Sequence, residues 1–282
     1  MKIAVLSDVH GNRPALEAVL EHMLQWGPDR VIVNGDLINR GPCSLHVLQL
    51  LLQTYPQTTF LKGNHECFVL ACARDEEPRA GPIYEMRKFT HWTYDQIGGE
   101  LLDRIGNWED GLDLGELGGG ELHITHGTCL GNRDGITPRT RDHELADKLG
   151  DRRGLFITSH THWPFIREYR GTSVVNSGSV GAPFDQDHRA AYLQLSLTRG
   201  RWDTEIVRLD YDRALAERDY RQSGFLDAGG PMTRIMLMEL RYSRGLIGPW
   251  MRNYETAVLR GEITLEQSVD IHLDRMLGTG ID

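Results

Sequence analysis

Short apolar runs of strand length alternate with helical segments through the first part of this 282-residue chain. The runs cover residues 2–6, 30–34 and 58–61, and apolar side chains at helical spacing lie between them at 16–23 and 45–52. Ser44 is the expected N-cap of the second helix. Strand, helix and strand at these distances predict right-handed βαβ units, in which neighbouring strands run parallel. This alternation predicts an α/β fold with a largely parallel sheet at its start.

The rest of the chain continues the alternation and then becomes helical. Residues 71–110 are typical of polar helices, and we expect them to form a cap-like insertion beside the strand ends. Further strands are expected at 112–114 and 121–125, as a hairpin with a glycine cluster at 118–120, and at 155–158, 173–175, 191–195 and 201–209. A Gly-Gly-Pro break follows residue 228. We therefore expect one domain over 1–228 and a helical C-terminal extension over 229–282 that packs on it.

Composition and charge argue against several classes of function. The net charge of −9 argues against a general nucleic-acid or anionic-membrane binder, which would normally be basic. No apolar run approaches the roughly 20 residues that cross a bilayer, and with a strand beginning at residue 2 we expect no secretory signal. The four cysteines have no CxxC spacing and are expected to be reduced thiols. A cytoplasmic protein is therefore expected.

Residue types that bind metal ions follow the predicted strands, at the edge where sites form in open α/β sheets. They are Asp8, His10, Asp36, Asn64, His65, His126, His160 and His162. Their carboxylate, amide and imidazole groups suit Zn, Mn or Fe, and the lack of a cysteine among them argues against a structural zinc site. Each motif alone is weak, because short Asp/His pairs also cap turns or lie on surfaces. Their ordered conjunction at five strand ends predicts metal binding.

In combination, these motifs resemble those of the calcineurin-like metallophosphoesterase superfamily. The series is Asp8-x-His10, Gly35-Asp36, Gly63-Asn64-His65-Glu66, His126-Gly127 and His160-x-His162. The stretch from Asn176 to Gly181 resembles a signature of the small bacterial phosphodiesterase branch. Ser159 stands where the family usually has glycine, and Ser177 stands where that signature has proline. These two departures affect local backbone geometry and remove no ligand.

The resemblance implies two stacked mixed β-sheets flanked by helices and a site for two divalent metal ions. Asp8, His10 and His162 would hold the first ion, Asn64, His126 and His160 the second, and Asp36 would bridge both. The ions would be Mn, Fe or Zn, with Mn expected to support activity, and a hydroxide bridging them would attack phosphorus. His65 would act beside the phosphate as a catalytic residue. Glu66 would either orient His65 or interact with a helix N-terminus.

The motifs leave the substrate open. The loop from Gly35 to Pro42 resembles that of protein Ser/Thr phosphatases and of symmetrical dinucleoside-tetraphosphate hydrolases, in which an arginine at the position of Arg40 binds the substrate phosphate. His160-x-His162 and the 176–181 loop instead favour small phosphodiesterases, and we give them more weight because they include metal ligands. We expect hydrolysis of phosphodiesters, and also of phosphomonoesters. A dinucleoside polyphosphate hydrolase and a Ser/Thr protein phosphatase-like enzyme are the alternatives.

A metal-binding scaffold of the same fold is the alternative from another class, and loss of a ligand would mark it. No ligand of the motifs is lost, so an enzyme acting on a small phosphoester or nucleotide substrate is favoured. A homo-oligomer contact, if formed, is expected at the C-terminal helices, although their packing on their own domain is favoured. Trp163 is a candidate for stacking on a substrate base, but Pro164 beside it favours structural packing.

Overall fold

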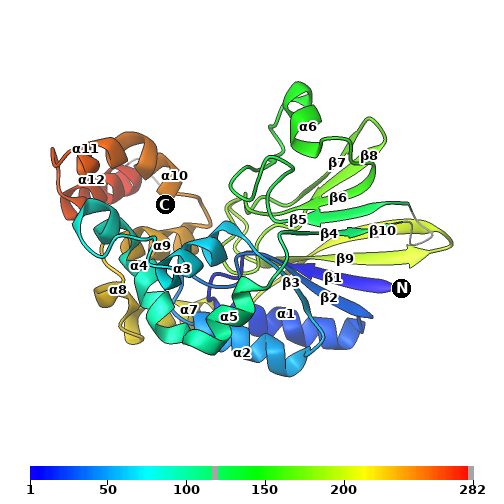
Figure 1. Ribbon diagram of the computed structural model, residues 1–282, viewed down its shortest axis with the longest axis horizontal. Helices are drawn as coiled ribbons and strands as arrows, with labels where there is room; N and C mark the ends of the chain where they lie inside the picture. The colour runs from blue at the N-terminus through cyan, green and yellow to red at the C-terminus, as the bar shows by residue number, and fades with distance from the viewer. Residues whose placement is uncertain (116–119, 279–282) are drawn as a thin grey trace.

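The computed structural model describes residues 1–115 and 120–278. Two stacked five-stranded mixed sheets form its centre, with helices on both sides, which confirms the expected sandwich (Figure 1). The first sheet has the order β10-β9-β1-β2-β3 and consists of β1 (Lys2–Leu6), β2 (Arg30–Asn34), β3 (Thr59–Leu61), β9 (Ala190–Thr198) and β10 (Arg201–Leu209). The second has the order β4-β5-β6-β8-β7 and consists of β4 (Gly111–Leu114), β5 (Leu122–Thr125), β6 (Gly154–Thr158), β7 (Phe165–Tyr169) and β8 (Thr172–Asn176).

Strand β1 shows why the sequences of the central strands are apolar at successive positions. Ile3 and Val5 point into the core between the two sheets, whereas Ala4 and Leu6 point into the core between the first sheet and its helices. A strand buried on both faces carries apolar residues throughout instead of alternating with polar ones. β1, β2 and β3 pair in parallel, and β9 and β10 add an antiparallel edge.

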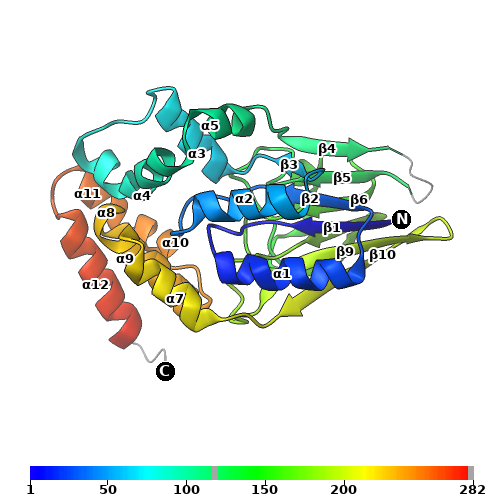
Figure 2. The same ribbon diagram turned by 90° about the horizontal axis from the view of Figure 1, so that it is seen from below.

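Helices α1 (Arg13–Trp26) and α2 (Ser44–Thr54) cover the outer face of the first sheet (Figure 2). Helix α6 (Asp142–Leu149) packs on the outer face of the second. The expected N-cap of α2 is wrong by one residue, because the helix begins at Ser44 itself. The Ser44 hydroxyl instead accepts a hydrogen bond from the backbone N of Asn39, at 2.9 Å, and so holds the preceding loop.

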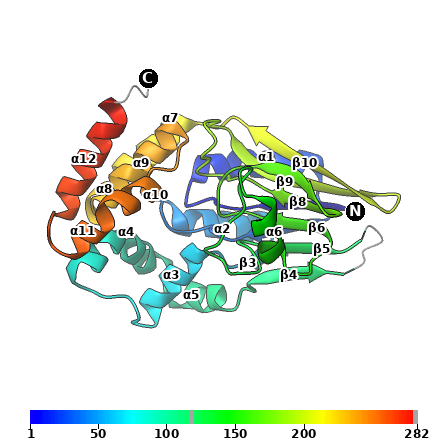
Figure 3. The same cartoon turned by 90° about the horizontal axis from the view of Figure 1, so that it is seen from above.

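The remaining helices gather at one end of the sandwich, beyond the strand ends (Figures 1 and 3). They are α3 (Asn64–Ala73), α4 (Gly81–Ile97), α5 (Gly99–Gly106), α7 (Arg213–Gln222), α8 (Phe225–Ala228), α9 (Met232–Tyr242), α10 (Ile247–Trp250), a π-helical turn (Met251–Glu255), α11 (Thr256–Leu259) and α12 (Leu265–Gly278). Met86 and Phe89 of α4 share one apolar cluster with α7 and all of the later helices, in which Trp250 is fully buried. The proposed division of the chain at residue 228 stays a prediction, and α7 and α8, which precede it, already contribute to this cluster.

Two elements had no counterpart in the sequence-based expectations. They are β7, which begins at Phe165 shortly after His162, and α6, which carries only two buried side chains. The predicted pairing of β4 with β5 is present, while residues 118 and 119 of the expected glycine cluster lie outside the described residues. Within residues 1–115 and 120–278, none of the helices combines the length and apolar character that crossing a bilayer requires.

Candidate metal centre

The predicted metal-ligating residues converge at one edge of the two sheets. Three groups have potential ligand atoms within 4.8 Å of one another: Asp8, His10 and His162; His10, Asp36 and His65; and Asp36, His126 and His160. They follow the carboxyl ends of β1, β2, β3, β5 and β6. Because Asp36 and His10 each occur in more than one group, the three groups form one continuous cluster. Asn64 joins it through its Oδ1, which lies 3.2 Å from His126 Nε2.

The ligand atoms of this cluster face one another closely. His162 Nε2 lies 3.2 Å from Asp8 Oδ1, and His126 Nε2 lies 3.3 Å from Asp36 Oδ2. His10 Nε2 lies 3.8 Å from Asp36 Oδ2. These four residues and Asp36 are almost completely buried. Burying two carboxylates without a compensating positive charge is unfavourable, so the arrangement is typical of a cation site.

Two further observations fit a metal ion at this place. Asp8 Oδ1 is fully buried, yet it has no hydrogen-bond partner among the described residues. The Nδ1 atoms of His126 and His162 lie 2.8 and 2.5 Å from the backbone oxygens of Asn34 and Ala182. A carbonyl oxygen can only accept, so each Nδ1 donates, and Nε2 of both rings is the nitrogen left to bind a metal ion.

The backbone of five of these residues lies in the left-handed region. The φ angles are 52° at Asp8, 48° at His10, 53° at Asp36, 65° at His160 and 58° at His162. This conformation is uncommon outside glycine, although Asp and His adopt it more often than other residues do. It turns the chain sharply after each strand and brings each side chain back over the sheet edge.

Two glycines allow the strand ends to approach. A Cβ added at Gly35, where φ is 80°, would lie 2.6 Å from both the backbone N of Gly63 and Nδ1 of His126. A Cβ at Gly63 would lie 2.1 Å from Oδ1 of Asp36. Larger residues at either position would therefore displace Asp36 or His126.

Asp36 and His126 influence the charge of each other. Burial favours the neutral acid, but the nearby imidazoles, His126 foremost, hold the pKa of Asp36 well below its usual value. Burial also opposes a charged imidazole, yet Asp36 raises the pKa of His126 to about 10. The pair is therefore ionised in the metal-free site, and a cation would take the place of the His126 proton.

His65 lies beside the cluster, and its position is set through the backbone. Its N–H donates to Asp36 Oδ1 at 2.9 Å, and its ring meets that of His10 edge-on with centroids 4.9 Å apart. Burial, partly opposed by Asp36 and helped by Arg40, lowers the pKa of His65 to about 3. The imidazole is therefore neutral, and Nδ1 has no partner in the part of the chain that the structure describes.

The carboxylate of Glu66 accepts hydrogen bonds from backbone N–H groups and makes none with the His65 ring in the described part of the chain. Its Oε2 accepts from the N–H groups of Asp36 and Gly63, both at 2.8 Å, and its Oε1 accepts from that of Ile38 at 3.2 Å. Of the two roles expected for Glu66, the helix N-terminal one agrees with this geometry, because Glu66 lies in the first turn of α3. It also ties the ends of β2 and β3 together, which sequence reasoning missed.

The two departures from the family motifs contact each other. Ser159 Oγ lies 3.0 Å from Ser177 Oγ, which in turn lies 2.9 Å from Ser7 Oγ. Asn34 donates to Ser159 Oγ at 2.7 Å and to the backbone O of Thr125 at 2.9 Å. The substituted serines thus form a buried hydrogen-bonded link between the ends of strands in both sheets.

Arg40 is held by the C-terminal helices. Its guanidinium Nη2 pairs with Glu239 Oε2 of α9, and Glu239 also accepts from the N–H groups of Leu246 and Ile247 at 2.7 and 2.9 Å. The guanidinium carbon lies 5.5 Å from the ring centroid of Phe184, which stacks on His162 with centroids 4.2 Å apart. Arg40 is therefore near the cluster, and nothing in the local motif indicates its partner 199 residues away.

Arg40 also depends on the residue before it. Asn39 has φ of 69°, and its side-chain oxygen accepts from the Arg40 N–H at 2.9 Å. The Asn39 amide donates to Thr90 of α4 at 3.1 Å. Asn39 thus shapes the turn that carries Arg40 and also fastens it to the helical insertion.

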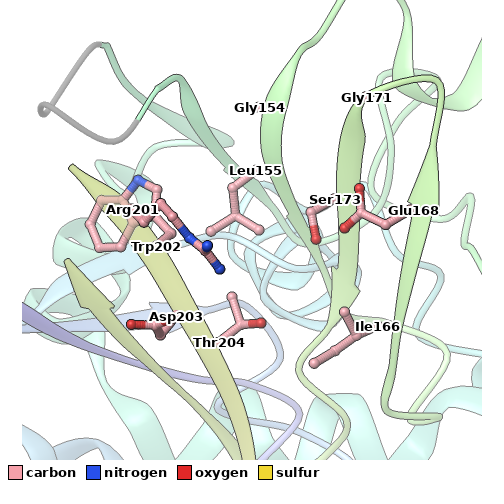
Figure 4. Close-up of a pocket in the computed structure, with 10 residues that line it drawn as sticks. All are labelled: Gly154, Leu155, Ile166, Glu168, Gly171, Ser173, Arg201, Trp202, Asp203 and Thr204. Carbon is pink, nitrogen blue, oxygen red and sulfur yellow. The ribbon is translucent and has the colours of Figure 1, made fainter. Parts of the chain in front are cut away.

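A pocket of about 510 Å³ between the sheets lies away from this cluster (Figure 4). It is lined by Gly154 and Leu155 at the start of β6 and by Arg201 and Trp202 at the start of β10. His160 and His162 follow the opposite end of β6, so this pocket is at the far end of the sandwich and makes no contribution to the metal centre.

Comparison with known proteins agrees with the geometry. Residues 1–193 match the family described as calcineurin-like phosphoesterase. A symmetrical bis(5'-nucleosyl)-tetraphosphatase of Pseudomonas syringae pv. syringae is 37% identical over 79 residues, which are 27% of this chain and 27% of that protein. Serine/threonine-protein phosphatase 2 of Escherichia coli is 47% identical over 70 residues, which are 24% of this chain and 31% of that protein. The chain thus spans about a quarter to a third of the length of these curated relatives.

A solved structure shares the fold over almost its whole length. The metallophosphoesterase from Sphaerobacter thermophilus superimposes with a TM-score of 0.69 at 22% identity, covering 86% of this chain and 99% of that chain. The family match extends over more than half of the sequence and contains every predicted ligand. The protein therefore belongs to the calcineurin-like phosphoesterase family.

Proposed function

We propose that the protein is a metal-dependent phosphoester hydrolase with two divalent ions, of which Mn is expected to support activity. The observation that carries the proposal is the convergence of Asp, Asn and His side chains from five strand ends around a buried carboxylate oxygen that has no partner among the described residues. Asp8, His10 and His162 would hold one ion, Asn64, His126 and His160 the other, and Asp36 would contact both. When bound, the ions would bind phosphate oxygens, activate water and stabilise the charge that develops during phosphoryl transfer.

Two further residues of the chain would act on the phosphate. His65 is buried and neutral, so it would donate a hydrogen bond to a phosphate or leaving-group oxygen without adding a charge. Arg40 has one guanidinium nitrogen paired with Glu239 and no side-chain hydrogen bond to any other described residue. Its remaining N–H groups would bind phosphate oxygens in a fixed direction, because Glu239 and Phe184 hold the guanidinium plane.

Phosphodiesters are the first substrate candidates, because the paired histidines belong to the cluster and the 176–181 loop contacts it, with Ser179 Oγ donating to the backbone oxygen of Asp8. The second candidate is a phosphoanhydride of the dinucleoside polyphosphate type. It is favoured by Arg40 beside the cluster and by the similarity to a symmetrical tetraphosphatase. A phosphoprotein substrate has the support of one similar protein phosphatase.

Hydrolysis of bis-p-nitrophenyl phosphate in the presence of Mn tests the proposal, with bound metal measured by elemental analysis. Asp36→Ala and His126→Ala are expected to abolish both activity and metal binding. The matched control is His123→Ala, since His123 is a buried histidine of β5, the strand that His126 follows, and is paired with Asp113 outside the cluster. The proposal fails if either ligand variant keeps full activity or if the wild-type protein binds no metal.

The substrate candidates are separated by a panel of diesters, monoesters, dinucleoside polyphosphates and phosphopeptides. Arg40→Ala is expected to reduce kcat/KM for any substrate whose phosphate it contacts. Loss confined to monoesters and dinucleotides would favour the second candidate over the first.

A further inference from the structure

A second cavity, of about 730 Å³, lies between the loops of the second sheet and the C-terminal helices. Its lining includes Arg139 from the segment between β5 and α6, Arg244 from the segment between α9 and α10, and Arg252 from the π-helical turn. Trp163 and Phe184 form an aromatic part of its wall. Two of the three arginines thus come from the region outside the family match, which ends at residue 193.

The three arginines are not neutralised by the protein. The lining contains no aspartate or glutamate. Across residues 1–115 and 120–278, none of the three guanidinium groups forms a salt bridge or a hydrogen bond, although that of Arg139 lies over the Trp163 ring at 5.5 Å. By contrast, Arg241, three residues before Arg244, pairs with Glu217 at 2.7 Å. In a chain with a net charge of −9, three unpaired guanidinium groups around one cavity produce a local positive potential.

The cavity adjoins the metal centre through a single aromatic wall. Phe184 lines the cavity, and its ring stacks on the ring of His162 at 4.2 Å and 15°. Trp163 follows His162 directly and donates from Nε1 to the Phe184 backbone oxygen at 2.6 Å. Thr161, between the two metal-binding candidates His160 and His162, is also part of the lining. The cavity therefore lies directly beside the metal centre.

We propose that this cavity binds phosphate groups of the substrate other than the one that is cleaved, so that the preferred substrates carry several phosphorus atoms. Guanidinium groups bind phosphate through paired, charge-assisted hydrogen bonds, and three of them around one cavity accommodate more than one phosphate. The inference rests on the proposed function, because it places the cleaved phosphate at the metal centre. It names the substrate class, polyphosphorylated compounds, that this function leaves open.

The pocket of Figure 4 also contains an arginine, but the charges of its lining are mixed. In the pocket of Figure 4, Arg201 is accompanied by Glu168 and Asp203, so negative and positive charges are mixed. That pocket also lies at the opposite end of β6 from the metal centre. Arg201→Ala is therefore a matched control, in which an exposed pocket arginine is removed without an expected effect on phosphate binding.

Two measurements test the proposal with the full chain. The first is calorimetric binding of inorganic tripolyphosphate after treatment with a chelator, which excludes the metal ions from the result. Arg244→Ala and Arg252→Ala are each expected to weaken binding about tenfold, as loss of one charge-assisted contact does, whereas Arg201→Ala leaves it unchanged. Circular dichroism checks that the variants are folded. Binding that is absent in the wild type, or equal in wild type and both cavity variants, overturns the inference.

The second measurement compares substrates in the Mn-loaded enzyme. Arg244→Ala and Arg252→Ala are expected to raise KM for a dinucleoside tetraphosphate about tenfold and to leave kinetics on bis-p-nitrophenyl phosphate, which has one phosphorus atom, within twofold. Equal effects on both substrates overturn the inference and leave the proposed hydrolase in place. If the wild type cleaves neither compound, the proposed hydrolysis of these substrates fails, while tripolyphosphate binding still decides whether the cavity is a phosphate site.

Discussion

The ion pair between Arg40 and Glu239 connects the strand-end loop to the C-terminal helices, and Glu239→Gln tests its importance. Glu239 is only 2% exposed and Arg40 12% exposed, so the pair is largely shielded from water. Glutamine keeps the length and one acceptor oxygen, which can still serve the N–H groups of Leu246 and Ile247. It removes the negative charge that Arg40 faces.

The expected cost follows from this burial. Removing one partner of a buried ion pair typically costs about 3–5 kcal/mol, because the other charge stays buried and unpaired. Arg40 keeps some contact with water, so we expect the lower end, a decrease in the free energy of unfolding of about 3 kcal/mol. For a chain of this size that corresponds to a decrease in Tm of about 5 °C. Without Glu239 to hold it, the guanidinium of Arg40 loses its fixed direction. KM should therefore rise for substrates whose phosphate Arg40 contacts.

Urea denaturation followed by circular dichroism measures the change in stability. A double-mutant cycle with Arg40→Met isolates the interaction between the two side chains. Glu217→Gln is the matched control. Glu217 pairs with Arg241, which lies in α9 like Glu239, but Glu217 is 30% exposed. Loss of its charge is therefore expected to lower the free energy of unfolding by less than about 1 kcal/mol. A coupling energy between Arg40 and Glu239 below about 0.5 kcal/mol, as for an exposed pair, would refute the reasoning.

Three further predictions concern other parts of the molecule. Gly181→Ala is expected to lower the free energy of unfolding by about 3 kcal/mol in urea denaturation, because a Cβ there would lie 1.9 Å from the Val9 backbone oxygen; unchanged stability would contradict the close approach. Burial raises the pKa of Cys43 to about 12 and that of Cys72 to about 11, so at pH 8 a thiol reagent should label the exposed Cys129 well before these two, as peptide mapping would show. Mn at a hundredfold excess over its Kd should stabilise the chelator-treated protein by about 2.7 kcal/mol, and an unchanged melting temperature in thermal denaturation would speak against a folded-state metal site.

The fold and the gathering of the candidate ligands were predictable because they depend on local patterns. Each strand is a short apolar run, and parallel strands place the residues that follow them at one edge. Asp8, Asp36 and His126 could therefore be brought together on paper without knowledge of the loops. The stacking of two mixed sheets came from the family resemblance and is confirmed by the structure.

The contacts made across long sequence distances were not predictable. Glu239 lies in an ordinary amphipathic helix, and only the folded chain brings it to Arg40. The cavity arginines come from three separate segments and show no common motif. Glu66 was recognisable as part of a motif, but its three backbone partners belong to loops whose geometry no periodicity describes. Helix α6 was missed because few of its side chains are apolar.

The left-handed backbone of the five ligand candidates has a consequence for how the sequence can change over time. A non-glycine residue in that region costs of order 1–3 kcal/mol, so the five positions together keep the native state less stable than relaxed turns would. Replacing such a residue by glycine, which adopts this conformation freely, would relieve that strain. All five positions nevertheless hold Asp or His. Glycine at any of them would favour the backbone but remove a candidate ligand, so such a variant is expected to gain stability at the expense of metal binding.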